Sequence, residues 1–232
     1  MMNLWVLSLL LAGVIASIYT KKLTIPAALT GGILGWLTYA GGGYMGLEML
    51  AAFFVLGTAA TSYNAAEKRL LKTNDSHQTR RTTGQVIANG GVAALAGLAI
   101  LLFPSVKPIL LAAMAGSLAS ATADTLSSEL GIIYGRRFFN ILTGRRDEKG
   151  LDGVISLEGT LIGLGGSAII GLLYITTNHP TGGFWIILLA GTLGNLADSF
   201  LGASLERKGF IGNNTVNFLN TLLAAIVAGF LI

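Results

Sequence analysis

The chain has 232 residues, of which 53% are hydrophobic and only 11% are charged, and its formal net charge is +4. An average soluble domain carries about 25% charged residues. The composition therefore excludes an ordinary soluble enzyme, a disordered chain and a nucleic-acid-binding domain, and it predicts an all-α polytopic membrane protein.

Eight apolar stretches follow one another along the chain. Most are close to the ~20 residues that an α-helix needs to cross a hydrocarbon core of about 30 Å. The apolar runs are continuous and do not alternate with a period of two, which argues against a barrel. We expect about eight transmembrane helices in a single domain, 1–232, at residues 3–19, 24–40, 44–62, 85–103, 108–133, 154–176, 183–203 and 214–232.

The distribution of positive charge orients these helices. With eight crossings, 14 of the 15 Lys and Arg residues fall on one side, and only Lys107 falls on the other. By the positive-inside rule the basic side is cytoplasmic, together with the two long polar loops at about 63–84 and 134–153. Lys21 and Lys22 follow the first apolar run, which favours a retained first helix with an outside N-terminus. We expect an integral protein of the cell (plasma) membrane.

A short internal similarity relates two pairs of predicted helices. Residues 123–125 (ADT) resemble residues 197–199 (ADS), and Asn89-Gly90 and Glu158-Gly159 open the preceding helix of each pair. A parallel duplication would explain this pattern. Chance matches in a chain rich in Gly and Ala would explain it equally well.

Polar residues inside apolar helices are costly in a bilayer and are therefore candidates for function. In the predicted topology nearly all of them lie near the cytoplasmic end, next to the two basic loops. The acidic candidates are Asp124, Glu129, Glu158 and Asp198. The amide and hydroxyl candidates are Asn89, Ser128, Asn213, Asn214 and Asn217.

Acidic and basic side chains at one membrane level favour a metal–phosphate site over a purely acidic ion pathway. Carboxylates hold Mg²⁺, and cationic side chains neutralise phosphate oxygens. We expect Asp124, Glu129 and Asp198 to be catalytic metal ligands, and Arg145, Arg146 and Lys149 to bind phosphate.

Each candidate also has a structural interpretation. Asp124 and Asp198 could instead make structural hydrogen bonds between helices. Glu129 could pair with an Arg of a loop, and Glu158 could be a solvated residue at a helix start, where acids are favoured. Asp124 and Glu129 are five residues apart, about 140° around an ideal helix. They could share one ion only if the helix breaks there or if a second set of ligands intervenes.

Five separated motifs resemble an integral-membrane family long described as a domain of unknown function. It includes transmembrane protein 19 of animals and the plastid phytyl-phosphate kinase of the vitamin E pathway. The resemblance covers residues 25–232 in the right order. The motifs are residues 85–92 (QVIANGGV), 123–131 (ADTLSSELG), 153–160 (GVISLEGT), 194–199 (GNLADS) and 213–219 (NNTVNFL).

This resemblance implies phosphorylation of an isoprenoid monophosphate, such as phytyl or geranylgeranyl phosphate, to the diphosphate. It implies CTP as the donor, while Mg²⁺ is the cofactor that the acidic candidates predict. Asn89, Glu158, Asn213, Asn214 and Asn217 would then orient the lipid or the nucleotide. The oligomeric state stays open.

Two other functions stay open at this point. An ion-coupled transporter or permease could use the buried acids as a cation path. A CTP-dependent nucleotidyltransferase would make a CDP-lipid and release pyrophosphate, whereas a kinase would release CDP.

Overall fold

The computed structural model of the chain describes residues 3–71, 80–176 and 181–232, without the side chains of residues 69–71. Lys72 of the first predicted basic loop therefore lies outside the described residues. The helices are α1 (Leu4–Tyr19), α2 (Ile25–Ser62), α3 (Ala65–Leu71), α4 (Thr83–Leu102), α5 (Lys107–Tyr134), α6 (Leu157–Ile175), α7 (Gly182–Leu201) and α8 (Asn213–Leu231). A 3₁₀ turn (Pro104–Val106) precedes α5, and a π turn (Gly202–Glu206) extends α7.

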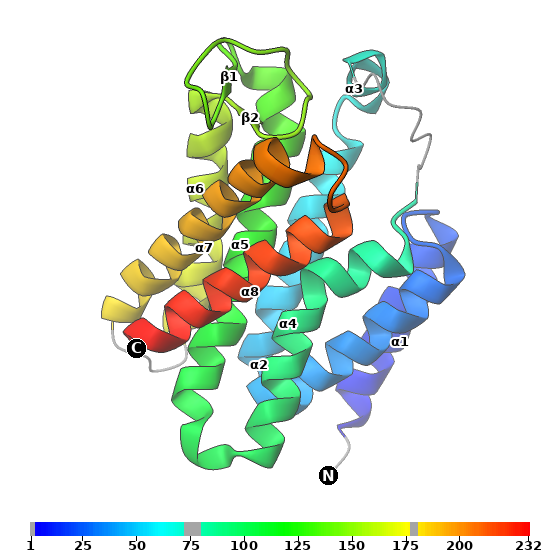
Figure 1. Cartoon of the computed structure of the whole chain (residues 1–232). Helices are drawn as coiled ribbons and strands as arrows, with labels where there is room; N and C mark the ends of the chain where they lie inside the picture. The colour runs from blue at the N-terminus through cyan, green and yellow to red at the C-terminus, as the bar shows by residue number, and fades with distance from the viewer. Residues whose placement is uncertain (1–2, 72–79, 177–180) are drawn as a thin grey trace.

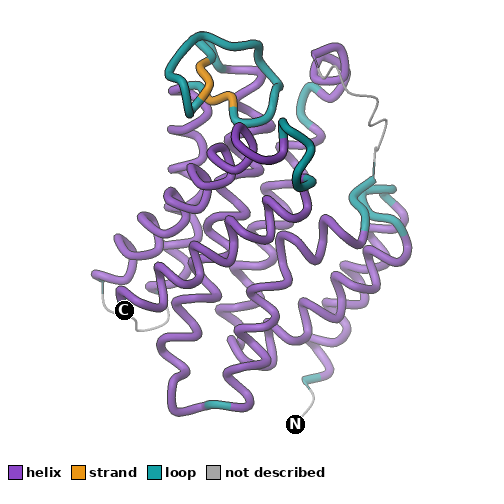
Figure 2. Tube along the Cα trace, viewed as in Figure 1, coloured by secondary structure: helices purple, strands orange, loops and turns teal. Residues whose placement is uncertain are grey.

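Six helices are long and apolar enough to cross a membrane, namely α2, α4, α5, α6, α7 and α8, while α1 is shorter at 16 residues. The prediction of an all-α polytopic membrane protein is confirmed (Figures 1 and 2). The structure leaves the internal duplication as a prediction.

Helix α2 joins two of the predicted membrane segments, 24–40 and 44–62. Its 38 residues are interrupted at Gly43, whose φ of 65° and ψ of −154° are not helical. Glycine has no Cβ and adopts this conformation without a steric penalty. Figure 1 shows the two arms of α2 running in different directions. The predicted turn at Gly41–Gly43 is thus a break at a single residue in a longer helix.

Helix α5 is the centre of the bundle and contacts α2, α4, α6, α7 and α8. Its buried face consists largely of Ala, Ser and Gly, which let neighbouring helices approach closely. A Cβ built on Gly116, for example, would lie 2.6 Å from the carbonyl oxygen of Ala224 on α8. The high glycine content therefore serves helix packing.

The tightest helix contact gives a first prediction. Gly97 of α4 packs on the backbone of α2, where an added Cβ would lie 2.3 Å from the carbonyl oxygen of Leu37. We expect Gly97→Ala to lower the free energy of unfolding by roughly 1–3 kcal/mol, because the two backbones must separate. Thermal unfolding in detergent measures the effect. The control is Gly165→Ala on α6, where the added Cβ meets nothing within 4 Å, and equal melting temperatures for the two variants would contradict the explanation.

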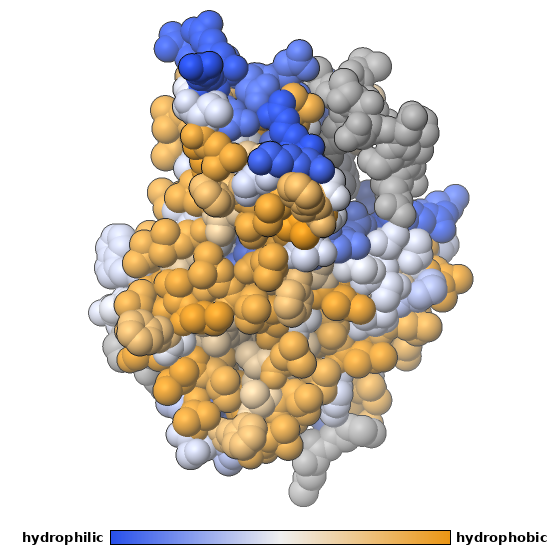
Figure 3. Space-filling view, in the orientation of Figure 1, coloured by the Kyte–Doolittle hydropathy of each residue, from blue (hydrophilic) through white to orange (hydrophobic). Residues whose placement is uncertain are grey.

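The predicted boundary between the loop 134–153 and the helix 154–176 differs from the structure. The apolar run begins at Val154, but Val154 and Ile155 form strand β2 (Val154–Ile155), which pairs antiparallel with β1 (Phe139–Asn140). The helix begins only at Leu157 because the Ser156 hydroxyl caps it by accepting from the backbone N–H of Gly159 at 3.1 Å. The loop therefore extends beyond its predicted end at residue 153, and its residues 139–155 form an ordered hairpin, which lies at the polar end of the molecule in Figure 3.

Candidate functional site

A cavity of about 1610 Å³ opens at the hairpin end of the bundle. Its wall is built from α2 to α8, together with the loop before α2 and the β1–β2 hairpin. Eight of the residues singled out from the sequence line this cavity: Asn89, Asp124, Ser128, Glu129, Asp198, Asn213, Asn214 and Asn217.

Two of the carboxyl groups that line the cavity lie close together. Asp124 of α5 and Asp198 of α7 lie within hydrogen-bonding reach of each other. Asn220 of α8 donates from Nδ2 to Oδ1 of Asp198 at 2.6 Å, and its Oδ1 accepts from the Ser120 hydroxyl at 3.0 Å. Asn220 is fully buried, so α8 fixes the orientation of the Asp198 carboxyl.

Glu129 lies in the same cavity but has a different partner. Its Oε2 is 2.5 Å from Nζ of Lys68, which also donates to the carbonyl oxygens of Ala60 at 2.7 Å and Thr61 at 3.1 Å. Helix α5 continues without a break from Asp124 to Glu129. Within residues 3–71, 80–176 and 181–232, no group of three or more acidic, His or Cys residues is placed to hold a metal ion. The structure therefore brings Asp124 and Asp198 together and pairs Glu129 with Lys68, and metal ligation by these three residues stays a prediction.

Basic side chains line the same cavity. The basic rim, as we call it, consists of Lys21, Lys22, Lys68, Arg80 and Arg81.

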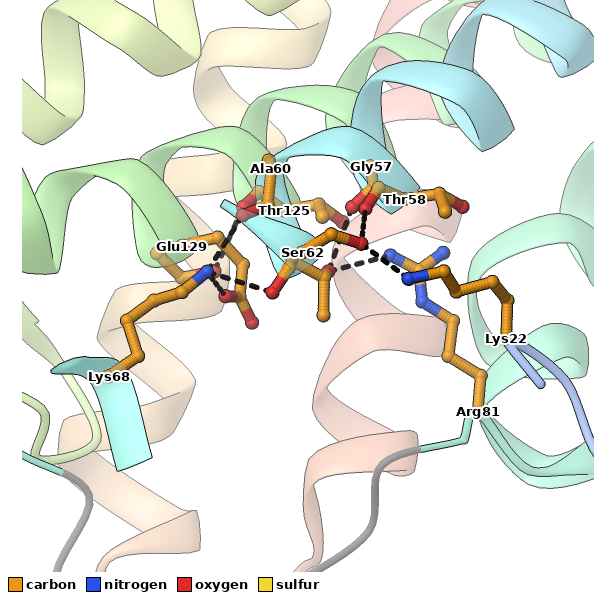
Figure 4. Close-up of polar contacts among 11 residues, drawn as sticks. Lys22, Gly57, Thr58, Ala60, Ser62, Lys68, Arg81, Thr125 and Glu129 are labelled. Atoms are coloured by element: carbon orange, nitrogen blue, oxygen red, sulfur yellow. Dashed lines mark hydrogen bonds and ion pairs between the residues drawn. The ribbon is translucent and has the colours of Figure 1, made fainter. Parts of the chain in front are cut away.

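The backbone holds two segments of this rim together. Arg81 donates its N–H to the carbonyl oxygen of Lys22 at 2.9 Å, and the carbonyl oxygen of Arg81 accepts from Thr24 at 3.1 Å. The side chains then reach the end of α2 (Figure 4): Lys22 Nζ donates to the Ser62 hydroxyl at 2.7 Å, and Arg81 Nη2 donates to the Thr61 hydroxyl at 3.4 Å.

The Arg81 guanidinium is placed against both apolar and acidic groups. It lies 5.8 Å from the ring centre of Phe53. Burial lowers the pKa of Arg81, while the negative charges of Glu129 and Asp124 act in the opposite direction. Arginine stays protonated at neutral pH under such shifts, so a cation lies within electrostatic reach of Asp124 in the same cavity.

Four predicted site residues lie outside the cavity wall. Arg145, Arg146 and Lys149 are exposed on the connection between β1 and β2, where the backbone turns back on itself through a bond from Asn140 N–H to the Arg145 carbonyl. Glu158 lies in the first turn of α6 and accepts from the backbone N–H of Arg136 at 3.3 Å. These side chains are therefore not brought to the aspartate pair.

Two buried amides in the wall are incompletely bonded. The Oδ1 atoms of Asn89 and Asn217 are buried and have no hydrogen-bond partner within the described part of the chain. Asn89 uses its Nδ2 to donate to the Gln85 carbonyl at 2.9 Å, and Asn217 is only 8% exposed. Unsatisfied buried polar atoms are rare and costly, so both are suited to contact a ligand or an ordered water.

Comparison with known proteins assigns the chain to a family. The family described as Integral membrane protein DUF92 matches residues 8–225. The chain belongs to the DUF92 family.

Several DUF92 relatives resemble the chain along most of its length. The Uncharacterized membrane protein MJ0933 of Methanocaldococcus jannaschii is 36% identical over 199 residues, which cover 84% of this chain and 79% of the relative. Protein VTE6, chloroplastic, of Arabidopsis thaliana is 32% identical over 88% of this chain, and the match spans 62% of that relative. The Uncharacterized membrane protein sll0875 of Synechocystis is 32% identical over 92% of this chain and 84% of its own length. No solved structure matches the chain.

Sequence reasoning missed Lys21, Lys22 and Lys68 as members of the DUF92 site. These three cations were interpreted only as loop charges that set the topology, because nothing local indicates that the segment after α1 pairs with the segment before α4. Arg81 was weighed for phosphate contact on the same footing as Arg145, and Asn220 was recognised as an amide on the same helical face as Asn217.

An ion pair attaches the hairpin of this DUF92 protein to the end of α7. Arg207 Nη1 lies 2.5 Å from Oδ2 of Asp147. The hydrogen bond from Arg207, helped by the backbone N–H of Glu148, lowers the pKa of Asp147 to about 2. The nearby hairpin residues 150–153 line the cavity, so this pair helps to hold one wall in place.

This ion pair gives a pH prediction. A lowered carboxyl pKa stabilises the folded hairpin above the unfolded pKa of about 3.9, and the contribution is lost as the pH falls toward 2. We expect Arg207→Gln to return the pKa of Asp147 toward the ordinary range, measured by NMR titration of selectively labelled aspartate. Lys208→Gln, which alters the next and exposed cation, serves as the control, and an unmoved Asp147 titration in Arg207→Gln would refute the assignment.

Proposed function

We propose that this DUF92 protein is a membrane-embedded prenyl-phosphate kinase. It transfers the terminal phosphoryl group of a nucleoside triphosphate, CTP by the family resemblance, to a phytyl-like or geranylgeranyl-like monophosphate. The observation that carries the proposal is that an aspartate pair and a basic rim line one and the same cavity at the polar end of an apolar helical bundle. The motif resemblance to the family of the plastid phytyl-phosphate kinase and the relative VTE6 support it.

The donor atoms of the cavity fit Mg²⁺. This ion is typically bound through one or two carboxylates, with substrate phosphates and water completing the octahedron. Asp124 and Asp198 would hold it, and Asn220 would keep the Asp198 carboxyl in position. When bound, the ion would neutralise charge on the phosphate oxygens.

The basic rim supplies the remaining countercharge. Lys22 donates one hydrogen bond to Ser62, and Arg81 donates one long hydrogen bond to Thr61. A lysine ammonium has three donors and an arginine guanidinium has five, so both cations keep donors for phosphate oxygens. These residues replace Arg145, Arg146 and Lys149 in the proposed phosphate contacts.

The chemistry requires positioning more than proton transfer. An oxygen of the lipid monophosphate attacks the terminal phosphorus of the donor, and a new P–O bond forms. The bond from that phosphorus to its bridging oxygen breaks, and the electron pair leaves with the nucleoside diphosphate. Because the attacking phosphate is already ionised at neutral pH, the wall needs no general base. Asn89 and Asn217 would orient the two substrates by accepting hydrogen bonds at their Oδ1 atoms, which have no partner in the described part of the chain.

The location of the cavity suits two substrates that differ in solubility. If the basic end faces the cytoplasm of a cell with the protein in its plasma membrane, a nucleotide arrives from water. The lipid phosphate arrives along the bilayer with its head at the same level. Neither substrate then has to cross the membrane.

A product assay tests the proposal. Purified protein is incubated with geranylgeranyl or phytyl phosphate, Mg²⁺ and CTP labelled at the γ-phosphate, with ATP as the alternative donor. Labelled prenyl diphosphate and CDP are the expected products. Pyrophosphate release would indicate a nucleotidyltransferase. Absence of product with every donor from folded protein would refute the kinase.

A substitution in the basic rim gives a second functional prediction. We expect Arg81→Gln to raise the KM for the nucleotide roughly 10- to 100-fold, because a charge-assisted contact to phosphate contributes about 1.5–3 kcal/mol. Arg137→Gln, at an exposed position outside the cavity wall, is the matched control. Steady-state kinetics with varied nucleotide measure both, and an unchanged KM in Arg81→Gln would remove this residue from the phosphate contacts.

A further inference from the structure

A second hollow lies beside the polar cavity, between α7 and α8. This apolar groove of about 510 Å³ is lined by Ile141, Leu196, Ala197, Phe200, Leu201, Leu219 and Leu223. Every lining side chain is a hydrocarbon, so the groove offers nothing to a phosphate or a nucleotide.

The groove is adjacent to the proposed reaction site. Leu196 lines both the groove and the polar cavity. The same short stretch of α7 carries Asp198 of the aspartate pair into the cavity. A molecule with a phosphate head near Asp198 could therefore extend an apolar chain past Leu196 without leaving the surface of the protein.

The groove is also open toward the bilayer. Phe200 is 53% exposed and Leu223 is 40% exposed, and both belong to helices long and apolar enough to cross the membrane. Figure 1 shows α7 and α8 side by side, and Figure 3 shows this face of the molecule covered mainly by apolar side chains. A lipid chain can thus enter sideways from the hydrocarbon phase.

We infer that the groove between α7 and α8 binds the isoprenoid tail of the lipid monophosphate, an assignment that rests on the proposed function. It commits the lipid to the α7–α8 side of the cavity, with its phosphate at the aspartate pair. The triphosphate of the nucleotide then lies against the basic rim, on the side of α2 and the segment before α4. The groove therefore sets the preference for tail length, whereas the rim acts on the nucleotide.

Filling the groove tests this assignment. Ala197→Phe introduces an aromatic ring into the groove from α7. Leu223→Trp introduces one from α8, at a position remote in sequence from Asp124 and Asp198. The control is Ala12→Phe on α1, where the alanine is exposed and outside the groove. The kcat/KM is measured with geranylgeranyl phosphate (20 carbons) and with dimethylallyl phosphate (5 carbons), whose tail is too short to fill the groove.

We expect both groove variants to reduce the kcat/KM for geranylgeranyl phosphate, relative to that for dimethylallyl phosphate, by about tenfold or more. A hydrophobic pocket changes kcat/KM by roughly 10- to 200-fold for each methylene that it gains or loses as a contact. The control should keep the wild-type ratio. An unchanged ratio in folded groove variants overturns the assignment.

A label on the tail makes the test independent of turnover. Geranylgeranyl phosphate with a diazirine at the tail end is photolysed on the full chain, and the adducts are mapped by mass spectrometry. Adducts at residues 196–201 and 219–223 that an excess of unlabelled geranylgeranyl phosphate competes away support the groove, whereas adducts elsewhere overturn it. Correct adducts without any phosphotransfer would refute the kinase and retain the lipid site.

Discussion

Asp198→Asn is expected to reduce phosphotransfer by roughly 10²- to 10³-fold, which is the scale of losing one preorganised electrostatic contact to a transition state. The substitution keeps the size of the side chain. In the wild-type protein Asn220 Nδ2 lies 2.6 Å from Oδ1 of Asp198, and the amide oxygen of the variant can still accept this hydrogen bond. Only the negative charge and one oxygen ligand are lost. The fold should therefore survive while the affinity for Mg²⁺ falls.

Two measurements separate this explanation from simple damage to the helix contact. The dependence of kcat on Mg²⁺ concentration should shift to higher concentrations in Asp198→Asn, while the melting temperature stays near the wild-type value. The control Glu148→Gln removes an exposed acid outside the cavity wall and should leave both quantities unchanged. Wild-type activity in Asp198→Asn would exclude Asp198 from the chemistry.

The membrane class and most helix positions are predictable because they depend on local composition. A run of about 20 apolar residues must be helical in a bilayer, whatever its neighbours are. The break at Gly43 and the strand at Val154–Ile155 were harder to predict from the sequence. The break depends on the backbone angles of one residue, and the strand depends on pairing with a segment elsewhere in the chain. Hydropathy reports neither of them.

The acidic side of the site was more predictable than the basic side. A carboxylate inside an apolar helix is conspicuous because it is costly there, and the order of the helices already brings Asp124 and Asp198 to one level. A lysine in a polar loop is ordinary. Lys22 and Arg81 become neighbours only through backbone bonds between two segments about 60 residues apart in the chain, and no periodicity encodes that contact.

Glu129 illustrates why spacing alone could not assign its partner. The angle of about 140° between Asp124 and Glu129 on one helix already separated the two carboxylates, so a shared ion needed a break in α5. The helix is continuous, and Glu129 takes the alternative that the sequence also allowed, a pair with a basic side chain from the adjoining loop. The identity of that cation, Lys68, depends on how α3 folds back on the end of α2.

The Lys68–Glu129 pair leads to the second large effect, on stability. The side chains are 5% and 15% exposed, and Lys68 also donates to the Ala60 and Thr61 carbonyls at the end of α2. We expect Lys68→Met to lower the free energy of unfolding by about 3–5 kcal/mol, because it leaves a largely buried carboxylate without its closest cation and two helix-end carbonyls without their donor. Chemical unfolding in mixed micelles measures this loss, and Lys149→Met, at an exposed position, is the control.

A double-mutant cycle decides whether the loss comes from the pair. Glu129→Leu alone leaves the ammonium group of Lys68 without its carboxylate partner. Lys68→Met combined with Glu129→Leu removes both charges and leaves two apolar side chains in contact. The double variant should therefore be less destabilised than the sum of the single variants, with a coupling of about 1–3 kcal/mol. Strictly additive losses would mean that Lys68 stabilises the protein through the α2 carbonyls alone, and that Glu129 is available to the phosphate chemistry of the cavity.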